Sequence, residues 1–393
     1  MRNQTVLISG ASIAGPALAY WLDRYGFTVT VVERAPVLRP GGQAVDFKSE
    51  THLTVLERMG VLDEIRRRET GRTDVIYVDD RGREKARMTG EFLGGVVEIL
   101  RGDLAEVLAE PTMGTCEYLI GDSVTALVES PSGVYVEFEN APARTFDLVV
   151  GCDGIHSRVR GLAFGPERDY VTYLGYYYCA AGAPGWGHDP AHKERNTAQA
   201  WHAPGRTATA GGSKAAHLYV FASPELDYDR RDIEAQRRIV MQRFAGMGGG
   251  VPDMLAELAQ LPDFYLDSLS QVRLRGDYTR GRIALVGDSA YGNTLGGFGS
   301  GLAVVGAYVL AGELAVADGE HTVAYARYTE IMRRYAKIAG NPNGGRFLSP
   351  KTAVGIRLRN WFLGSPAFGL MMKYGDNAAN DIDLRDYEVA AGV

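Results

Sequence analysis

Residues 5 to 34 constrain the fold of this chain more than any other stretch. Thr5 to Ser9 (TVLIS) has the nearly continuous apolar character of a strand buried on both faces of a parallel sheet. Gly10 to Gly15 follows at once, Pro16 to Tyr25 has the composition of a helix with one apolar face, and Phe27 to Val32 is a second, β-branched strand. The sequence therefore predicts a β–α–β unit within an α/β fold.

The turn in this unit (GASIAG) predicts a dinucleotide-binding site. Gly10 permits the tight turn, Gly15 lets the helix pack closely on the strand, and the helix N-terminus offers free N–H groups to a pyrophosphate. Glu33 ends the second strand, where a carboxylate accepts hydrogen bonds from an adenosine ribose. Ser12 replaces the middle glycine of G-x-G-x-x-G, so the backbone approaches the phosphate past a small side chain. The alternative is a glycine-rich turn without a ligand.

Length, charge and cysteine content bound the remaining possibilities. A chain of 393 residues can bury a large core and is expected to form two closely packed domains. The net charge of −6 argues against a nucleic-acid partner. Three widely spaced cysteines indicate reduced thiols in a cytoplasmic protein, and no signal peptide is expected, because residue 1 leads directly into the first predicted strand. The longest apolar run, residues 301 to 310, is expected to be too short and glycine-rich for membrane insertion.

The rest of the chain predicts a discontinuous organisation. Residues 170 to 220 are aromatic and β-rich without a β–α–β rhythm, which indicates an inserted antiparallel sheet. A strand at 281–286 then leads into Gly287-Asp288 and a long helix over 302–317, with further helices expected near 322–338 and 351–374. We therefore predict a dinucleotide-binding domain over 1–169 and 262–340. A β-rich substrate domain is predicted over 170–261, with parts of 70–100, and a helical segment over 341–393.

Four separated motifs carry a family resemblance. They are the first turn with its strand-end acid, R-x-x-L at Arg101, D-G-x-x-S-x-x-R from Asp153 to Arg160, and G-D at Asp288 before a glycine-rich helix start. The set resembles the FAD-dependent aromatic hydroxylases of the para-hydroxybenzoate hydroxylase type (group A flavoprotein monooxygenases). It is most similar to the tetracycline-inactivating monooxygenases and their actinobacterial relatives. The resemblance covers nearly the whole chain, and implies a Rossmann-like FAD-binding domain with an inserted mixed or antiparallel β-sheet substrate domain and C-terminal helices.

The resemblance also implies a role for each matching position. The positions expected to contact FAD are Gly10, Ser12, Ile13, Ala14 and Gly15 at the pyrophosphate, Glu33 and Arg34 at the adenosine half, Asp46 in the loop beside the flavin ring, Arg101 and Asp288 at the ribityl chain, Asp153 between FAD and NAD(P)H, and Gly297, Phe298, Gly299 and Ser300 at the ring's carbonyl edge. FAD is expected to bind tightly without a covalent link, and NADPH or NADH to bind transiently. Arg39 is a candidate for the NAD(P)H phosphates, or a solvated loop arginine.

Plain structural alternatives stay open at several of these positions. Asp288 follows a strand and precedes a turn, where it could simply cap a helix. Arg101 could be a surface arginine, because R-x-x-L is a common pattern. Tyr291 to Leu295 (YGNTL) departs from the family, whose members have histidine and paired prolines there, so the wall of the flavin ring is expected to be altered.

The resemblance implies a monooxygenase that oxygenates a large aromatic or polyketide-like molecule through a flavin C4a-hydroperoxide, as in antibiotic or secondary metabolism. No side chain is then a catalytic nucleophile, because the flavin carries the chemistry. Tyr176, Tyr178 and Trp201 are candidates to line the substrate site, although at most Tyr176 and Tyr178 share one strand face, and that face could be plain core. Few arginines are available to bind a carboxylate: Arg195 and Arg206 in the inserted sheet, and Arg357 near the C-terminus.

Two other functions fit the same motifs. One is a flavin-dependent reductase or dehydrogenase of a polyketide or prenyl substrate, and the other is a flavoprotein that binds a ligand without turnover. The seven histidines form no metal-binding spacing, so no metal is expected. The partners expected are an aromatic or polyketide-like small-molecule substrate and O2, and the chain is predicted to be a monomer or a weak homodimer.

Overall fold

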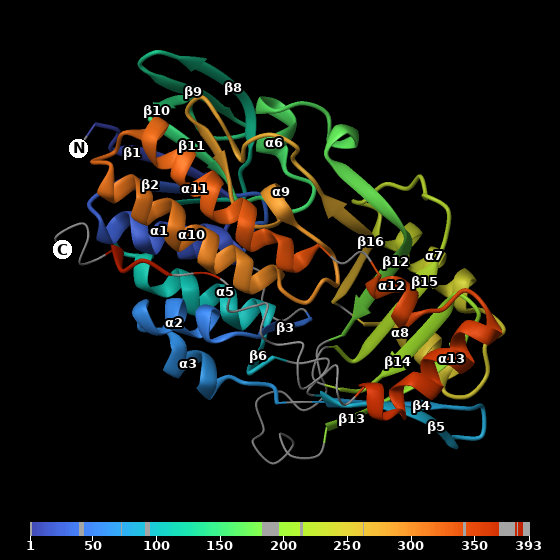
Figure 1. Cartoon of the computed structure of the whole chain (residues 1–393). Coiled ribbons are helices and arrows are strands. Elements are labelled where there is room, and N and C mark those ends of the chain that lie inside the picture. Colours follow the sequence, from blue (N-terminus) through green and yellow to red (C-terminus); the bar gives the residue numbers. More distant parts are fainter. Residues whose placement is uncertain are drawn as a thin grey trace.

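The computed structural model describes residues 2–38, 43–71, 73–90, 95–182, 196–212, 215–261, 263–340, 343–368, 382 and 384–387. Two large sheets dominate it, one parallel and surrounded by long helices, the other mostly antiparallel, and they lie beside each other in Figure 1. The predicted mixed α/β fold is therefore confirmed.

The parallel sheet contains the predicted β–α–β unit. Strand β1 (Thr5–Ser9), helix α1 (Ala14–Arg24) and strand β2 (Thr28–Glu33) begin and end within two residues of the predicted bounds. The sheet has the order β17-β18-β11-β1-β2-β7, and only β17 is antiparallel to its neighbour. The other four strands are β7 (Glu117–Ile120), β11 (Leu148–Gly151), β17 (Thr279–Arg280) and β18 (Ile283–Leu285).

The carboxyl ends of the central strands lie in one row. Ser9 pairs with Gly151 and Val32, and Gly151 pairs with Leu285. The chain leaves β1 to one side through α1 and β2, whereas β11 and β18 are added later on its other side. Ligands of open α/β sheets bind where the strand order reverses in this way, outside the carboxyl ends of the strands.

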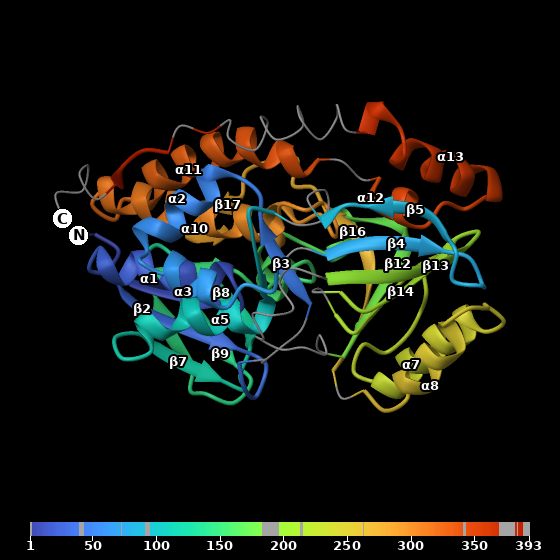
Figure 2. The same cartoon turned by 90° about the horizontal axis from the view of Figure 1, so that it is seen from below.

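Helices cover the parallel sheet and bury its central core. Figure 2 shows α1, α10 (Gly299–Val316) and α11 (His321–Tyr335) stacked on one side of the sheet. The remaining helices of this part are α2 (Glu50–Arg58), α3 (Leu62–Arg67), α5 (Arg101–Ala109), α6 (Arg158–Ala163) and α9 (Asp288–Tyr291). A three-stranded antiparallel sheet, β8 (Val124–Ser130), β9 (Gly133–Phe138) and β10 (Arg144–Phe146), and a two-stranded one, β3 (Ala44–Phe47) and β6 (Val97–Leu100), complete it.

The second sheet has seven strands in the order β16-β12-β15-β14-β13-β4-β5. They are β4 (Thr73–Val78), β5 (Glu84–Met88), β12 (Val171–Ala181), β13 (Asn196–Ala203), β14 (Arg206–Ala210), β15 (His217–Ala222) and β16 (Phe264–Val272). The early hairpin β4–β5 forms one edge of this sheet. Strand β16 lies beyond the predicted domain boundary at residue 261, yet forms an edge of the same sheet.

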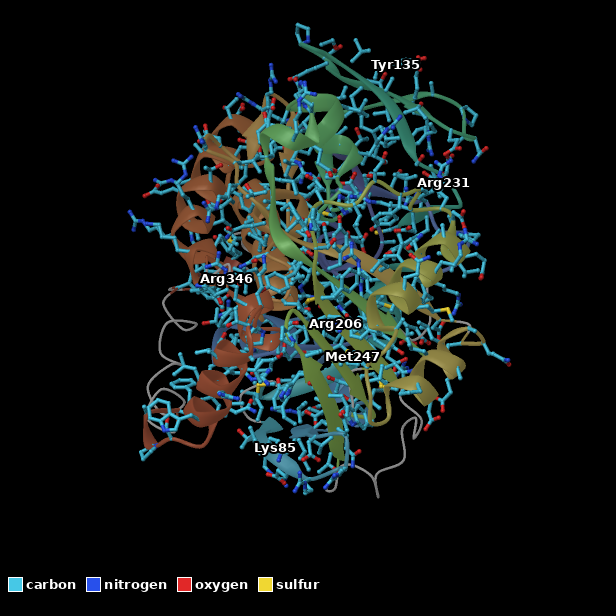
Figure 3. All side chains as sticks on the ribbon, turned by 90° about the vertical axis from the view of Figure 1, so that its right-hand side faces the viewer. Lys85, Tyr135, Arg206, Arg231, Met247 and Arg346 are labelled. Carbon is cyan, nitrogen blue, oxygen red and sulfur yellow. The ribbon has the colours of Figure 1, made fainter. Side chains whose placement is uncertain are left out.

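Two helices, α7 (Ile233–Phe244) and α8 (Val251–Leu258), cover one face of this second sheet. Arg206 donates hydrogen bonds to the carbonyl oxygens of Arg243 (2.8 Å) and Ala245 (3.4 Å), and lies beside Met247 in Figure 3. Tyr177 points into this covered face, whereas its neighbours on β12 point to the other face.

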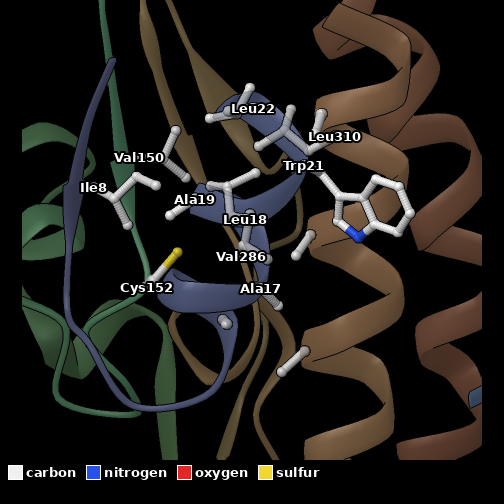
Figure 4. Packing of buried hydrophobic residues seen from close by; sticks show 14 of the residues in the cluster. Ile8, Ala17, Leu18, Ala19, Trp21, Leu22, Val150, Cys152, Val286 and Leu310 are labelled. Atoms are coloured by element: carbon white, nitrogen blue, oxygen red, sulfur yellow. The ribbon is translucent and has the colours of Figure 1, made fainter. Parts of the chain in front are cut away.

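The core between α1, α10 and the parallel sheet is closely packed. Figure 4 shows Leu18 of α1 beside Val150 of β11, with Trp21 turned toward α10. The Trp21 ring meets the Tyr308 ring edge-on, with centroids 4.8 Å apart. Within the described part of the chain, α10 is the one helix long and apolar enough to cross a membrane, but 78% of it is buried in the molecule, as in the core helix of a soluble protein. The apolar run at residues 301 to 310 is thus part of a longer core helix.

Two short helices end the described part of the chain. Helix α12 (Gly344–Leu348) lies over β12 and β15, and α13 (Ala353–Leu363) packs on the β4–β5 hairpin. The sequence predicts helix over residues 351 to 374, of which the structure describes 353 to 363 as helical.

Candidate active site

The first turn leaves the start of α1 open to a ligand. Gly10 has a φ of +107°, and a Cβ there would lie 2.5 Å from the carbonyl oxygen of Cys152 on the neighbouring strand. A Cβ on Gly15 would overlap the carbonyl oxygen of Gly10. Ile13, the N-cap residue of α1, makes no side-chain capping bond, so the first N–H groups of the helix face outward from Ala14 onward. A helix start of this kind binds a phosphate.

Glu33 is held against this turn by two backbone donors. Its carboxylate accepts hydrogen bonds from the N–H groups of Ala11 and Ala35, each at 2.8 Å. Arg34 follows on the exposed side of the chain. Because a carboxylate has about four acceptor sites, Glu33 keeps capacity for the two hydroxyls of a ribose.

Ser12 has a specific partner. The guanidinium of Arg101, at the start of α5, donates to the Ser12 hydroxyl through Nε (3.1 Å) and Nη2 (3.0 Å). The side chain that replaces the usual glycine therefore fixes an exposed arginine at the mouth of the turn. Burial raises the pKa of the Asp288 carboxyl, and Arg101 is close enough for its charge to oppose that shift, so Arg101 lies near both the turn after β1 and the turn after β18.

The Asp288 side chain lies deep among protein atoms but remains accessible to solvent. Burial raises the pKa of its carboxyl and outweighs the attraction of Arg101, while the side chain still has accessible surface. Asp288 is therefore surrounded by protein atoms and still reachable from outside. Within the described residues nothing donates a hydrogen bond to this carboxylate, and α9 is preceded by Gly287 without a side-chain cap. The capping alternative for Asp288 is therefore wrong.

Gly287 allows the starts of α1 and α10 to approach each other beside Asp288. Its φ is +70°, and a Cβ there would lie 3.2 Å from Ala14 at the start of α1 and 3.4 Å from Ala303 in α10. On the far side, a Cβ on Gly299 would lie 3.5 Å from Oδ1 of Asp288. The unpartnered carboxylate thus lies between the starts of two helices.

The start of α10 is also open. Phe298 precedes the helix without a side-chain cap, and Gly297 has a φ of +79°. Ser300 and the glycines around it keep this segment partly exposed. An uncapped helix start carries about half a positive charge, which favours electron-rich or anionic ligand atoms.

Strand β3 brings a charged pair to the same place. Nζ of Lys48 lies 3.5 Å from Oδ2 of Asp46, 5.6 Å from the centroid of the Phe298 ring, and beside Gly297, where a Cβ would be 2.7 Å from it. The structure therefore brings the predicted Asp46 to the start of α10. The sequence did not single out Lys48, although it directly follows the strand and stands two residues after Asp46, a spacing that indicates a shared face in extended backbone.

Comparison with known proteins identifies the family of this chain. A model of the FAD binding domain family matches residues 3–330. The chain belongs to this family. A flavin-dependent monooxygenase of Legionella longbeachae is 34% identical over 347 residues, covering 85% of this chain and 86% of that protein. An uncharacterized protein of Mycobacterium tuberculosis is 41% identical over 338 residues, covering 83% and 88%. The crystal structure of tetracycline destructase Tet(51) has a TM-score of 0.80 at 30% identity, and covers 99% of this chain and 100% of that chain. The resemblance to flavin-dependent monooxygenases is thus confirmed.

The residues present fit FAD. The uncapped starts of α1 and α10 match the pyrophosphate and an electron-rich ring edge, and Gly10 and Gly15 have no room for a Cβ. The Asp288 carboxylate between these helix starts can accept hydrogen bonds from donors such as ribityl hydroxyls. These contacts with FAD remain predictions for the individual residues.

The D-G motif of this flavoprotein supports its own loop. The Asp153 carboxylate accepts hydrogen bonds from the Ser157 hydroxyl and, at 3.0 Å, from the N–H of Val159. Burial raises the pKa of Asp153 and outweighs these bonds. Arg160 is buried and donates to the carbonyl oxygens of Ser289 (2.9 Å) and Ile155 (2.6 Å), so the loop is tied to the residue after Asp288.

The altered stretch 291–295 is divided between two places. Tyr291 is buried, and its hydroxyl lies 3.4 Å from that of Tyr328 and 3.4 Å from the carbonyl oxygen of Leu302. It therefore fills the core behind the sheet. Leu295 adopts a φ of +57° and packs with Tyr176 and Tyr178 on the face of the second sheet opposite α7 and α8.

The three aromatic candidates for the substrate do not lie on one surface. Tyr176 and Tyr178 share a buried cluster on the face opposite α7 and α8, and Tyr178 is close enough to Arg101 and Asp288 for their charges to act on its hydroxyl. Tyr176 is covered by α12 at Gly345. Trp201 lies on the opposite face in the core beneath α7 and α8. Arg39 lies outside the described residues, as do Gly41 and Gly42.

A buried network that the sequence analysis did not identify joins the D-G loop to the second sheet. Asp267 on β16 accepts from the Tyr265 hydroxyl (2.8 Å) and contacts Nε2 of His156 (3.1 Å), while Nδ1 of His156 lies 3.0 Å from Glu167. Burial alone would lower the pKa of His156, but its bonds to both carboxylates outweigh burial and raise it. The available signals were a histidine inside the D-G motif and an aspartate inside an apolar strand.

Proposed function

We propose that this flavoprotein is an NAD(P)H-dependent monooxygenase that inserts one oxygen atom into a large, mostly apolar, oxygenated ring compound such as an aromatic polyketide. The balanced reaction converts substrate–H, NAD(P)H, H⁺ and O2 into substrate–OH, NAD(P)⁺ and water. The observation that carries the proposal is the accessible, unpartnered Asp288 carboxylate between the open starts of α1 and α10.

FAD, when bound, supplies hydride acceptance and oxygen activation. The protein supplies placement: Asp288 and Arg101 would hold the ribityl chain, and the first turn with Glu33 would hold the adenosine half. The start of α10 would direct its N–H groups at the ring edge that becomes negative on reduction, and ordered donors of this kind cost no reorganisation during reaction.

The apolar face of the second sheet opposite α7 and α8 supports a large apolar substrate. Its cluster contains Tyr176, Tyr178, Val220 and Leu269, with Leu295 packed against it. Two of the three arginines considered for binding a carboxylate are placed elsewhere: Arg206 is bonded to the end of α7, and Arg357 is exposed on α13. Aromatic walls suit a flat polycycle recognised by stacking and a few hydroxyl contacts, and the similarity to a tetracycline destructase supports the same class.

The test compares substrates with and without O2. Purified FAD-loaded protein is given NADPH or NADH with hydroxybenzoates on one side and tetracycline-like or anthraquinone-like compounds on the other. We expect oxidation of the reduced nicotinamide, stimulated by the polycycles and coupled to a product one oxygen atom heavier. Coupled hydroxylation of the benzoates alone would refute the substrate class. A reduced product formed without O2 would establish the reductase alternative, and bound FAD without turnover would establish the ligand-binding alternative.

A further inference from the structure

One face of α13 is apolar and exposed. Val354 (71% exposed), Trp361 (68%) and Leu358 (62%) are the three most exposed large hydrophobic side chains in the described part of the chain. Their spacing of four and three residues places them on the same side of the helix. Scattered exposed leucines are normal in proteins, but a contiguous apolar stripe marks an interaction surface.

The helix beneath this stripe is firmly anchored. The Arg359 guanidinium lies 3.7 Å from the centroid of the Tyr77 ring and donates to the carbonyl oxygen of Leu348 at 3.0 Å. Thr352 caps the helix by accepting from the N–H of Gly355 at 3.0 Å. Figures 1 and 2 both place α13 at the outer edge of the molecule, beyond the second sheet. The stripe is therefore a preformed surface of a fixed helix.

The surroundings of the stripe are cationic. Of the described residues 343 to 368, which hold α12 and α13, four are lysine or arginine and none is aspartate or glutamate, in a chain whose net charge is −6. Arg346, Lys351 and Arg357 are exposed, and no carboxylate of the described residues forms an ion pair with any of them; Arg346 is labelled in Figure 3. Three acids of the hairpin on which α13 packs, Asp74, Asp79 and Glu84, are bonded to the hairpin's own cations, as Asp74 is to Arg87 at 3.0 Å.

Arg357 lies within the stripe by spacing, three residues after Val354 and four before Trp361. A two-fold contact between copies of this chain would place the Arg357 side chains of both copies near one apolar seam without an acid to separate them. An anionic lipid surface offers the opposite charge to every exposed cation and an apolar layer to the stripe. Charge complementarity thus favours lipid over a second copy.

We propose that the outer face of α13 docks the protein on anionic membranes, with the helix lying in the plane of the lipid headgroups. Tryptophan prefers this interface because its ring is apolar and its N–H is polar, and Arg357 can extend its charged end toward the headgroups. A helix of 11 residues is too short to span a bilayer, so the contact is peripheral. This inference goes beyond the proposed function and does not depend on it.

The experiment measures co-flotation of the full FAD-loaded chain with vesicles. One set contains phosphatidylcholine alone, and the other contains about one quarter phosphatidylglycerol. We expect binding to the anionic set, weakened when salt rises from about 0.1 to about 0.5 M. The double variant Leu358→Ser/Trp361→Ser should bind about tenfold more weakly or worse. Arg357→Glu, which leaves the apolar residues in place, should lose preference for the anionic set.

Two matched controls should bind as the parent does. Val323→Ser removes a 54% exposed valine from α11, and Arg66→Glu makes the same charge change on α3. Circular dichroism and bound FAD confirm the fold of each variant. The proposal is overturned if the parent binds neither vesicle, or if the α13 variants bind as well as the controls. It is also overturned if sedimentation equilibrium shows a dimer that Trp361→Ser dissociates, while the parent protein does not float with either set of vesicles.

Discussion

The variant Asp288→Ala distinguishes a cofactor ligand from a structural residue. The two roles predict changes of opposite direction in FAD affinity and in the stability of the apoprotein. The carboxylate is unpartnered among the described residues, so ribityl hydroxyls would be its first donors. A hydrogen bond to a charged group contributes about 1.5–3 kcal/mol. Since about 1.4 kcal/mol is a factor of ten, loss of one such bond should weaken FAD binding by at least about tenfold.

The apoprotein should respond in the opposite direction. Burial raises the pKa of Asp288 above its ordinary value, so the folded apoprotein holds this proton more tightly than the unfolded chain does. Stability therefore falls as pH rises from the ordinary pKa through the raised one, and ionised Asp288 is a net cost at neutral pH. Asp288→Asn keeps the shape and removes that cost. We expect apoprotein of this variant to melt at the same or a higher temperature near pH 7, with the difference vanishing below about pH 4.

The measurements are FAD titration by fluorescence quenching and thermal melts of apoprotein prepared at low salt. Asp147→Ala is the matched control at the opposite end of β1, because its Oδ2 accepts from the N–H groups of Gln4 (2.9 Å) and Thr5 (2.8 Å). That variant should lose about 2 kcal/mol of folding stability or more, with FAD affinity nearly unchanged. Normal FAD affinity together with a lowered apoprotein melting temperature in Asp288→Ala would refute the reasoning.

Three further outcomes are expected. Glu33→Ala should weaken FAD binding by less than Asp288→Ala and cost the apoprotein about 1 kcal/mol, because two backbone donors lose their acceptor; equal FAD affinity in titration would remove the ribose role. His156 stabilises the fold through Asp267 and Glu167 with a raised pKa. That stabilisation is complete below the ordinary pKa and is lost as pH rises through the raised value, so melts across about pH 6 to 9 should show a decline that His156→Gln lacks. Tyr178→Ala should raise KM for a polycyclic substrate with FAD content unchanged, and a KM equal to the parent's would place the substrate elsewhere.

Local sequence patterns were sufficient to predict the β–α–β unit of the parallel sheet. The bounds of β1, α1 and β2 follow from apolar runs interrupted by glycines, because a strand buried on both faces and a helix stop are each encoded within a few residues. The same logic located the open start of α10 and the turn at Asp288. These features depend on backbone geometry that only neighbouring residues determine.

Contacts between distant segments were beyond local reasoning. The bond from Arg101 to Ser12 joins α5 to the first turn, and it requires the two helices to be placed before the residues can be paired. The contact of His156 with Asp267 likewise depends on where β16 passes the D-G loop. Trp201 shows the same limit, because aromatic composition does not tell which face of a strand α7 and α8 will cover.

The residues from Tyr291 to Leu295 differ from the family pattern, and the effect of each difference depends on where its side chain lies in the fold. The Tyr291 ring meets Tyr278 edge-on at 5.3 Å, and a Cβ on Gly306 of α10 would overlap its hydroxyl. The tyrosine is therefore accommodated by a glycine in the core. Leu295, in contrast, holds a φ that costs a non-glycine residue about 1 kcal/mol or more, and it does so while packing on the face of Tyr176 and Tyr178. The left-handed backbone of Leu295, beside Tyr176 and Tyr178, thus places the effect of this departure on the face of the second sheet where we propose that the substrate binds.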